Sequence, residues 1–121
     1  MGDEPVGYHR EWTTRTGRRT RRRVGYTHDR GEVVRFVVQL EYKLGDEWET
    51  VVRYDHDESG ELAHDVSEEG LHIDIYRDGG KHATEFITRP LPAEVGLSLA
   101  EDHLSENAQR FIRRFEEWHV E

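Results

Sequence analysis

Two segments in the middle of the chain alternate apolar and polar residues with the period of two that half-buried β-strands show. The first covers residues 34–42 and the second covers residues 48–54. Their predicted inward-facing residues are Val34, Phe36, Val38, Leu40 and Tyr42 in the first, and Trp48, Thr50, Val52 and Tyr54 in the second. The intervening sequence, KLGDE, is typical of a turn. The pattern therefore predicts an antiparallel hairpin whose two apolar faces coincide.

A second hairpin is predicted further along the chain. Leu71, Ile73 and Ile75 alternate with polar residues, and the sequence DGG at residues 78–80 is typical of a turn. Residues 82–89 then form the returning strand, which ends before the prolines at 90 and 92. Between the hairpins, residues 55–70 are acidic and polar, and they predict a long loop with a short ordered piece near residues 62–66.

The last third of the chain has the period of an amphipathic helix. Ser98 and Glu101 have the spacing of a capping box, which predicts that the helix starts at Ser98 and continues for about 20 residues. Its apolar stripe consists of Ala100, Leu104, Ala108, Phe111, Phe115 and Trp118. We expect this stripe to pack against the sheet, although Phe115 and Trp118 could instead form the seam of a homodimer.

These elements together predict an α+β fold, an antiparallel sheet of four to five strands packed against one long C-terminal helix. At 121 residues the chain has room for one modest core. Residues 31–121 are expected to form a single α+β domain. Residues 1–30 are expected to form a basic arm or an N-terminal hairpin.

The amino-acid composition excludes some kinds of reactive site and indicates the environment of the protein. The chain has no cysteine, which excludes disulfides, thiolate metal sites and cysteine nucleophiles. Only two of its 17 basic residues are lysine, against 26 acidic residues, and this balance is typical of salt-loving archaea. A high-GC bacterium or an ordinary acidic protein would also fit. We expect a cytoplasmic protein, because no segment has the pattern of a signal peptide or of a membrane-spanning helix.

The charge is unevenly distributed along the chain. Residues 1–30 hold eight arginines and four acidic residues, whereas the rest is strongly acidic. Five of these arginines are candidates for binding nucleic acid or an acidic protein partner: Arg18, Arg19, Arg21, Arg22 and Arg23. The aromatic residues among them, Tyr8, Trp12 and Tyr26, could stack on bases. The alternative is that this segment packs back on its own domain.

The strongest candidate for chemistry is the strand at residues 71–77. If its apolar residues face the helix, His72, Asp74 and Tyr76 stand on the other face, about 6–7 Å apart. Asp55, His56, Asp57, His64, Asp65 and His82 lie nearby in the predicted topology. Mixed carboxylates and imidazoles suit Zn²⁺, Mn²⁺ or Ni²⁺, although no spacing specific to a metal site is present. The alternative is the ordinary polar face of a solvated strand.

Most other reaction classes lack their motif. The chain contains no nucleophile elbow, phosphate-binding loop, dinucleotide fingerprint or kinase signature. Metal-free ribonuclease chemistry remains open, because it needs only a base, an acid and a cation near the phosphate. His72 or His64, Tyr76, and Arg77 or Arg53 could fill those roles.

Residues from about 33 to 118 resemble small prokaryotic domains, of a kind found in haloarchaea, that are similar to the toxin components of TumE-type toxin–antitoxin pairs. The segments that carry the resemblance are VVRYD, GLHIDIYRDGG and AEDHLSENAQRFIRRFEEW. In such proteins a histidine-bearing strand commonly follows the RYD strand closely, whereas here a 16-residue acidic loop intervenes. The resemblance implies catalytic roles for Asp55, His72 and Asp74.

The sequence thus leaves more than one function open. The first is a toxin-like or nucleic-acid-processing domain of the cytoplasm, with an antitoxin as protein partner. The second is a non-catalytic module whose basic N-terminal segment binds nucleic acid or an acidic protein. The third is a small metal-dependent enzyme. No membrane partner is expected.

Overall fold

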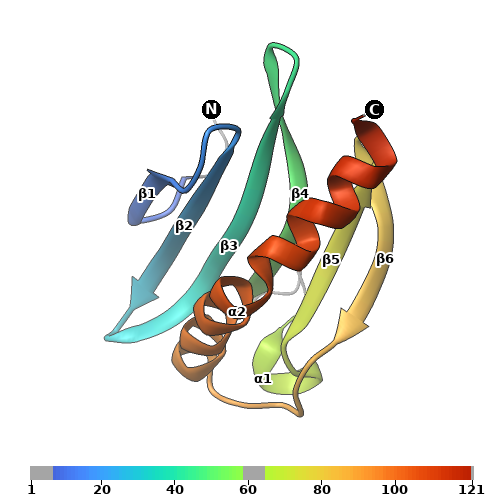
Figure 1. Ribbon diagram of the computed structural model, residues 1–121. Helices are drawn as coiled ribbons and strands as arrows, with labels where there is room; N and C mark the ends of the chain where they lie inside the picture. The colour runs from blue at the N-terminus through green and yellow to red at the C-terminus, as the bar shows by residue number, and fades with distance from the viewer. Residues whose placement is uncertain (1–6, 59–64, 121) are drawn as a thin grey trace.

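A computed structural model describes residues 7–58 and 65–120 of the chain. The fold is α+β, as predicted, with one antiparallel sheet and one long C-terminal helix (Figure 1). The elements are β1 (Arg10–Arg15), β2 (Thr20–Asp29), β3 (Glu32–Leu44), β4 (Glu47–Asp57), α1 (Val66–Glu69), β5 (His72–Arg77), β6 (Gly80–Phe86) and α2 (Ala93–His119). The sheet has six strands in the order β1 to β6, where four to five were predicted. The N-terminal segment supplies two of these strands, β1 and β2.

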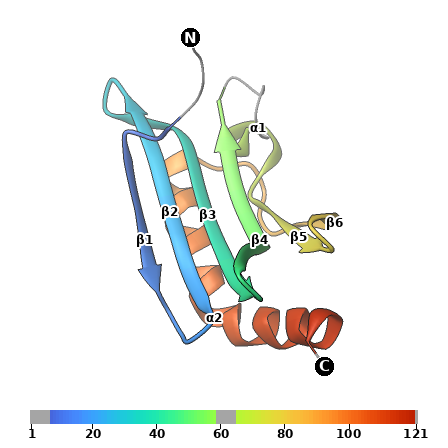
Figure 2. The same ribbon diagram turned by 90° about the horizontal axis from the view of Figure 1, so that it is seen from above.

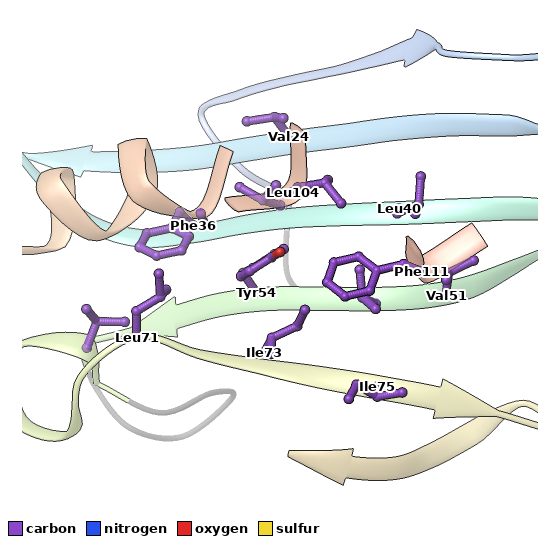
Figure 3. Packing of buried hydrophobic residues seen from close by; sticks show 14 of the residues in the cluster. Val24, Phe36, Leu40, Val51, Tyr54, Leu71, Ile73, Ile75, Leu104 and Phe111 are labelled. Atoms are coloured by element: carbon purple, nitrogen blue, oxygen red, sulfur yellow. The ribbon is translucent and has the colours of Figure 1, made fainter. Parts of the chain in front are cut away.

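The helix α2 crosses one face of the sheet and leaves the other face without a helix over it (Figure 2). Apolar side chains from the strands and from α2 meet in the layer between them (Figure 3). Phe36, Leu40 and Tyr54 on the sheet, and Leu104 and Phe111 on the helix, are each at most 2% exposed. We call the face of the sheet opposite α2 the open face. Polar side chains that alternate with the buried apolar residues along a strand point to this face.

The predicted facing of the first hairpin holds over most of its length and fails at one end. Phe36, Val38, Leu40 and Tyr42 are buried toward the helix, as are Val52 and Tyr54. The pairing of β3 with β4 shifts beyond Leu40, so that Leu40 pairs with Val52 but Glu41 pairs with Thr50. This β-bulge inserts one extra residue, Val51, and reverses the facing of the residues before it. Trp48 and Thr50 therefore lie on the open face, and their predicted inward facing is wrong.

Residues 10–29 form the hairpin of β1 and β2, and β2 pairs with β3 along most of its length. A second bulge, where Thr27 pairs with Arg35 but His28 pairs with Val33, puts Val33 rather than Val34 in the core. The arginine-rich segment thus forms two strands of the sheet, with Arg18 and Arg19 in the turn between them.

The helix starts earlier than the capping box predicts. α2 begins at Ala93, with Pro92 as its N-cap residue and no side-chain cap, so Ser98 lies inside the helix. Pro92 has φ −59°, which is compatible with a helix start. The buried stripe includes Ala100, Leu104, Phe111 and Phe115, as predicted. Within residues 7–58 and 65–120, no helix has the length and apolar character needed to cross a membrane.

The predicted 16-residue loop is shorter in the structure. β4 extends through Asp57, and α1 occupies residues 66–69, with the Ser67 backbone N–H donating to Asp65 Oδ1 over 2.9 Å. Residues 59–64 lie outside the described residues, and so does most of the ordered piece predicted near residues 62–66. The extension of β4 is what places Asp55 in the sheet.

Candidate functional site

Asp55, His72 and Asp74 lie together on the open face, on the neighbouring strands β4 and β5. Arg53 pairs with Asp74 across these antiparallel strands, so Asp55 lies opposite His72. His72 Nε2 is 3.5 Å from Asp55 Oδ1 and 3.8 Å from Asp74 Oδ2. One ligand atom from each of the three residues lies within 4.8 Å of the others. The structure therefore joins the three candidate residues in one cluster, which we call the Asp–His–Asp set.

The set is almost completely shielded from solvent. His72 is 0% exposed, Asp74 is 2% exposed and Asp55 is 7% exposed. Buried carboxylates need charged or hydrogen-bonding partners, because leaving them unpaired costs several kcal/mol, on the order of 3–5. The set must therefore be stabilised by the residues around it.

Each aspartate has one oxygen held by a neighbouring donor and one oxygen directed at His72. Arg53 Nε donates to Asp55 Oδ2 over 2.8 Å, and Asp55 Oδ1 faces the imidazole. Thr84 Oγ1 donates to Asp74 Oδ1 over 2.7 Å, and Asp74 Oδ2 faces the imidazole. The Lys81 ammonium lies 3.3 Å from that same Asp74 oxygen. These donors fix the orientation of both carboxylates.

The pKa of Asp55 reflects the balance between burial and its partners. Burial alone would raise the pKa of this carboxyl, but the neighbouring His72 imidazole and the hydrogen bond and positive charge of Arg53 lower it below its ordinary value. The same pairing raises the pKa of Arg53 against the opposing effect of burial. Asp55 is thus a carboxylate at neutral pH, able to accept a proton or to bind a cation.

A chain of polar contacts runs from the set across the open face to β2. Arg53 Nη1 donates to Gln39 Oε1 over 3.1 Å, and Gln39 Nε2 donates to Glu41 Oε2. Glu41 Oε1 accepts from Arg21 Nε over 2.5 Å. This chain connects the arginine-bearing hairpin to the Asp–His–Asp set through side chains of three adjacent strands.

Residues 7–121 match the model of a protein family described as a domain of unknown function (DUF7718). The chain belongs to this family. No curated protein and no solved structure matches it. The matched segment of this DUF7718 domain contains both the β1–β2 hairpin and the Asp–His–Asp set. The family description names no activity.

Three of the five predicted binding arginines of the DUF7718 domain are engaged by its own residues. Arg21 pairs with Glu41 and Arg23 pairs with Glu11. Arg22 points to the helix side of the sheet, where it donates to Ser105 Oγ over 3.0 Å. The like charges of β2 are thus separated by alternation onto two faces, and each has a partner that limits its use in binding.

The other two arginines stand at the end of the hairpin of the DUF7718 domain. Arg18 and Arg19 line a hollow of about 310 Å³ together with Arg15, Lys43 and Gly45. Among the described residues that line this hollow, none carries a carboxylate, and we call it the cationic hollow. Sequence reasoning missed Arg15 and Lys43 because their approach depends on how β1, β2 and β3 align, as in the bond from the Lys43 backbone N–H to the Arg19 carbonyl.

Other histidines proposed for the site lie elsewhere in the DUF7718 domain. His56 lies toward the helix, stacked on Phe36 with ring centroids 5.5 Å apart. His82 packs against Trp118 at 5.2 Å. His64 lies outside the described residues. The residues that sequence reasoning missed at the set are Lys81 and Thr84 on β6, although the pairing of Asp74 with Thr84 would follow from the correct register.

Proposed function

We propose that this chain is a toxin-like, nucleic-acid-processing domain that cleaves phosphodiester bonds. The observation that carries the proposal is a buried imidazole held between two carboxylates, with a guanidinium and an ammonium beside them. His72, Asp55 and Asp74 supply the first three groups, and Arg53 and Lys81 supply the cations.

Phosphodiester cleavage needs a group that takes a proton from the attacking oxygen and positive charge beside the phosphate. The imidazole and the two carboxylates hold proton-accepting atoms in fixed positions. Lys81, whose side chain is 51% exposed, and Arg53, at 29%, are the parts of this cluster that a phosphate meets first. Since the set itself is closed to solvent, a substrate reaches it only if neighbouring side chains move aside.

The cationic hollow supports a polyanionic substrate. It gathers Arg15, Arg18, Arg19 and Lys43 on a chain whose formal net charge is −9, so its potential differs in sign from most of the molecule. Lys43 stands four residues beyond Gln39 on β3, which is about 13 Å along the strand. A nucleic acid backbone held in the hollow can therefore extend toward the Asp–His–Asp set.

The test is expression in a related host of the wild type and of His72→Ala, followed by growth and by the integrity of total RNA. Growth arrest and RNA cleavage that His72→Ala abolishes are expected. His9→Ala is the matched control, because His9 is exposed and distant from the set in the sequence. Soluble wild-type protein that causes neither arrest nor cleavage, in cells and with purified RNA, would reject the proposal.

A non-catalytic binding module is the second candidate function, and the cationic hollow is the observation that favours it. In this case the hollow binds nucleic acid or an acidic protein, and the Asp–His–Asp set only stabilises the sheet. A toxin-like domain would in addition have a neutralising protein partner. RNA that binds wild type and His72→Ala equally, and is cleaved by neither, would favour the binding module.

A further inference from the structure

We infer that Asp55, His72 and Asp74 bind one divalent transition-metal cation, with Mn²⁺ as the representative ion. The three side chains are buried and converge on one point of the open face. Their ligand atoms come within 4.8 Å of one another, and all three residues are buried. They come from two rigid strands rather than from a loop, so their separation is fixed by the sheet.

The two separations measured from His72 are close to those between metal ligands. Bonds of about 2.0–2.2 Å at tetrahedral angles, as Zn²⁺ forms them, place neighbouring ligand atoms about 3.4 Å apart. The distances from His72 Nε2 to Asp55 Oδ1 and to Asp74 Oδ2 are 3.5 and 3.8 Å. These distances exceed those of good hydrogen bonds, which are about 2.7–3.2 Å. A cation between the three atoms would bring each of them within bonding distance.

The surroundings of the ligand atoms resemble the outer shell of a metal centre. Ligating carboxylates are usually oriented by further hydrogen bonds, which are needed for full metal affinity. Arg53 orients Asp55 and Thr84 orients Asp74, and each leaves the inward oxygen directed at the imidazole. Two carboxylates and one imidazole suit Mn²⁺, Zn²⁺ and related ions.

The bound cation would replace the ammonium group of Lys81 beside Asp74. This ammonium lies 3.3 Å from Asp74 Oδ2, the same oxygen that faces His72. The Lys81 side chain is 51% exposed, so it can leave without disturbing the core. The ion and Lys81 therefore compete for one carboxylate oxygen, and removing the lysine charge must tighten binding of the ion. A merely structural cluster predicts no such effect.

The experiment is titration of the full-length protein with Mn²⁺, in which the electron paramagnetic resonance signal of free Mn²⁺ reports the unbound ion. We expect one equivalent to bind the wild type. Lys81→Gln should bind about two- to fivefold more tightly, which is the effect of removing one exposed competing charge. Lys43→Gln removes the only other lysine of the chain and should leave the affinity unchanged.

Two further variants address the ligands themselves. Asp74→Asn should lose the bound equivalent. Thr84→Val preserves side-chain shape but removes the orienting hydroxyl, and should weaken binding by about tenfold. Circular dichroism establishes that each variant is folded. The absence of a bound equivalent in both folded wild type and Lys81→Gln, or equal affinity in these two proteins, would overturn the inference.

The use of the ion rests on the proposed function, whereas its binding is measured separately. A divalent cation would supply positive charge beside the phosphate and lower the pKa of a bound water. Mn²⁺ that binds as described, without any RNA cleavage, would support the metal site and reject the proposed function. RNA cleavage that EDTA leaves unchanged, by protein that binds no Mn²⁺, would support the proposed function and reject the metal site.

Discussion

Gly70, which precedes β5 by two residues, is predicted to be among the positions least tolerant of a side chain. Its φ of 88° and ψ of 167° lie in a backbone region that is essentially restricted to glycine. A Cβ added there would stand 2.1 Å from the carbonyl oxygen of Thr88 and 3.0 Å from the carbonyl carbon of Arg89. Both are backbone atoms, so no side-chain rotation relieves the contact.

The expected cost of Gly70→Ala follows from two terms. The backbone conformation costs about 1–3 kcal/mol for a residue with a Cβ. Moving the Thr88 carbonyl also disturbs the hydrogen bond from Leu71 N–H to Thr88 Oγ1, at 3.0 Å, and the one from Ile87 N–H to the Leu71 carbonyl, at 2.8 Å. Each contributes about 1 kcal/mol. We therefore expect a loss of roughly 3–5 kcal/mol, out of a typical total of about 5–15 kcal/mol.

Gly79→Ala is the matched control for this prediction. Gly79 also has a positive φ, of 79°, but an added Cβ meets nothing within 4 Å. The conformational cost of about 1–2 kcal/mol is partly offset by about 0.4–1 kcal/mol from the lower entropy of the unfolded variant, so a net loss of at most about 1.5 kcal/mol is expected. Urea unfolding followed by circular dichroism measures both losses. Equal losses for the two variants would show that the contact with Thr88 does not restrict the backbone.

Two further predictions concern pH and nucleic acid binding. Burial lowers the pKa of His56 below its ordinary value of 6.5, and His56 Nδ1 accepts a hydrogen bond from the Val66 N–H at 2.9 Å. The unfolded chain thus binds a proton at this histidine more readily than the folded chain, so stability should fall as the pH drops below about 6.5. The urea midpoints measured at pH 7.5 and 5.5 should therefore differ less in His56→Gln than in the wild type. An equal difference in the two proteins would refute this role of His56. Replacing Arg18 and Arg19 together by Glu should weaken binding of a single-stranded oligonucleotide by at least about tenfold at low salt, and should reduce the salt dependence of binding, as measured by fluorescence anisotropy. The control Arg113→Glu on α2 should have little effect. Comparable losses of affinity in the two variants would indicate a general charge effect.

The facing of the strands could largely be predicted from the sequence, because alternation is a local property. Phe36, Val38 and Leu40 face the helix as their spacing predicts. The bulge at Val51 could not be predicted, since an extra residue becomes visible only when the partner strand is aligned. The early start of the helix was missed because a capping box can occur inside a helix without capping it.

Part of the candidate site could also be predicted from the sequence. His72 and Asp74 share a face by the period of two, and this is a local property. Asp55 joins them only because β4 continues beyond its apolar residues and aligns with β5, which sequence patterns do not establish. Lys81 and Thr84 depend in addition on the alignment of β5 with β6, which contains a register shift after Ile75.

The strand order β1 to β6, with α2 last, has a consequence for how the chain is made. Each strand pairs with its neighbour in sequence, so the hairpins of the sheet can form in order as the chain leaves the ribosome. The apolar face that carries Val38, Leu40 and Tyr54 is covered by α2, and therefore only after residues 93–119 have been synthesised. During that interval the nascent sheet exposes its core to the cell. We therefore expect completion of the helix, rather than formation of the strands, to be the step that protects this protein from aggregation during synthesis.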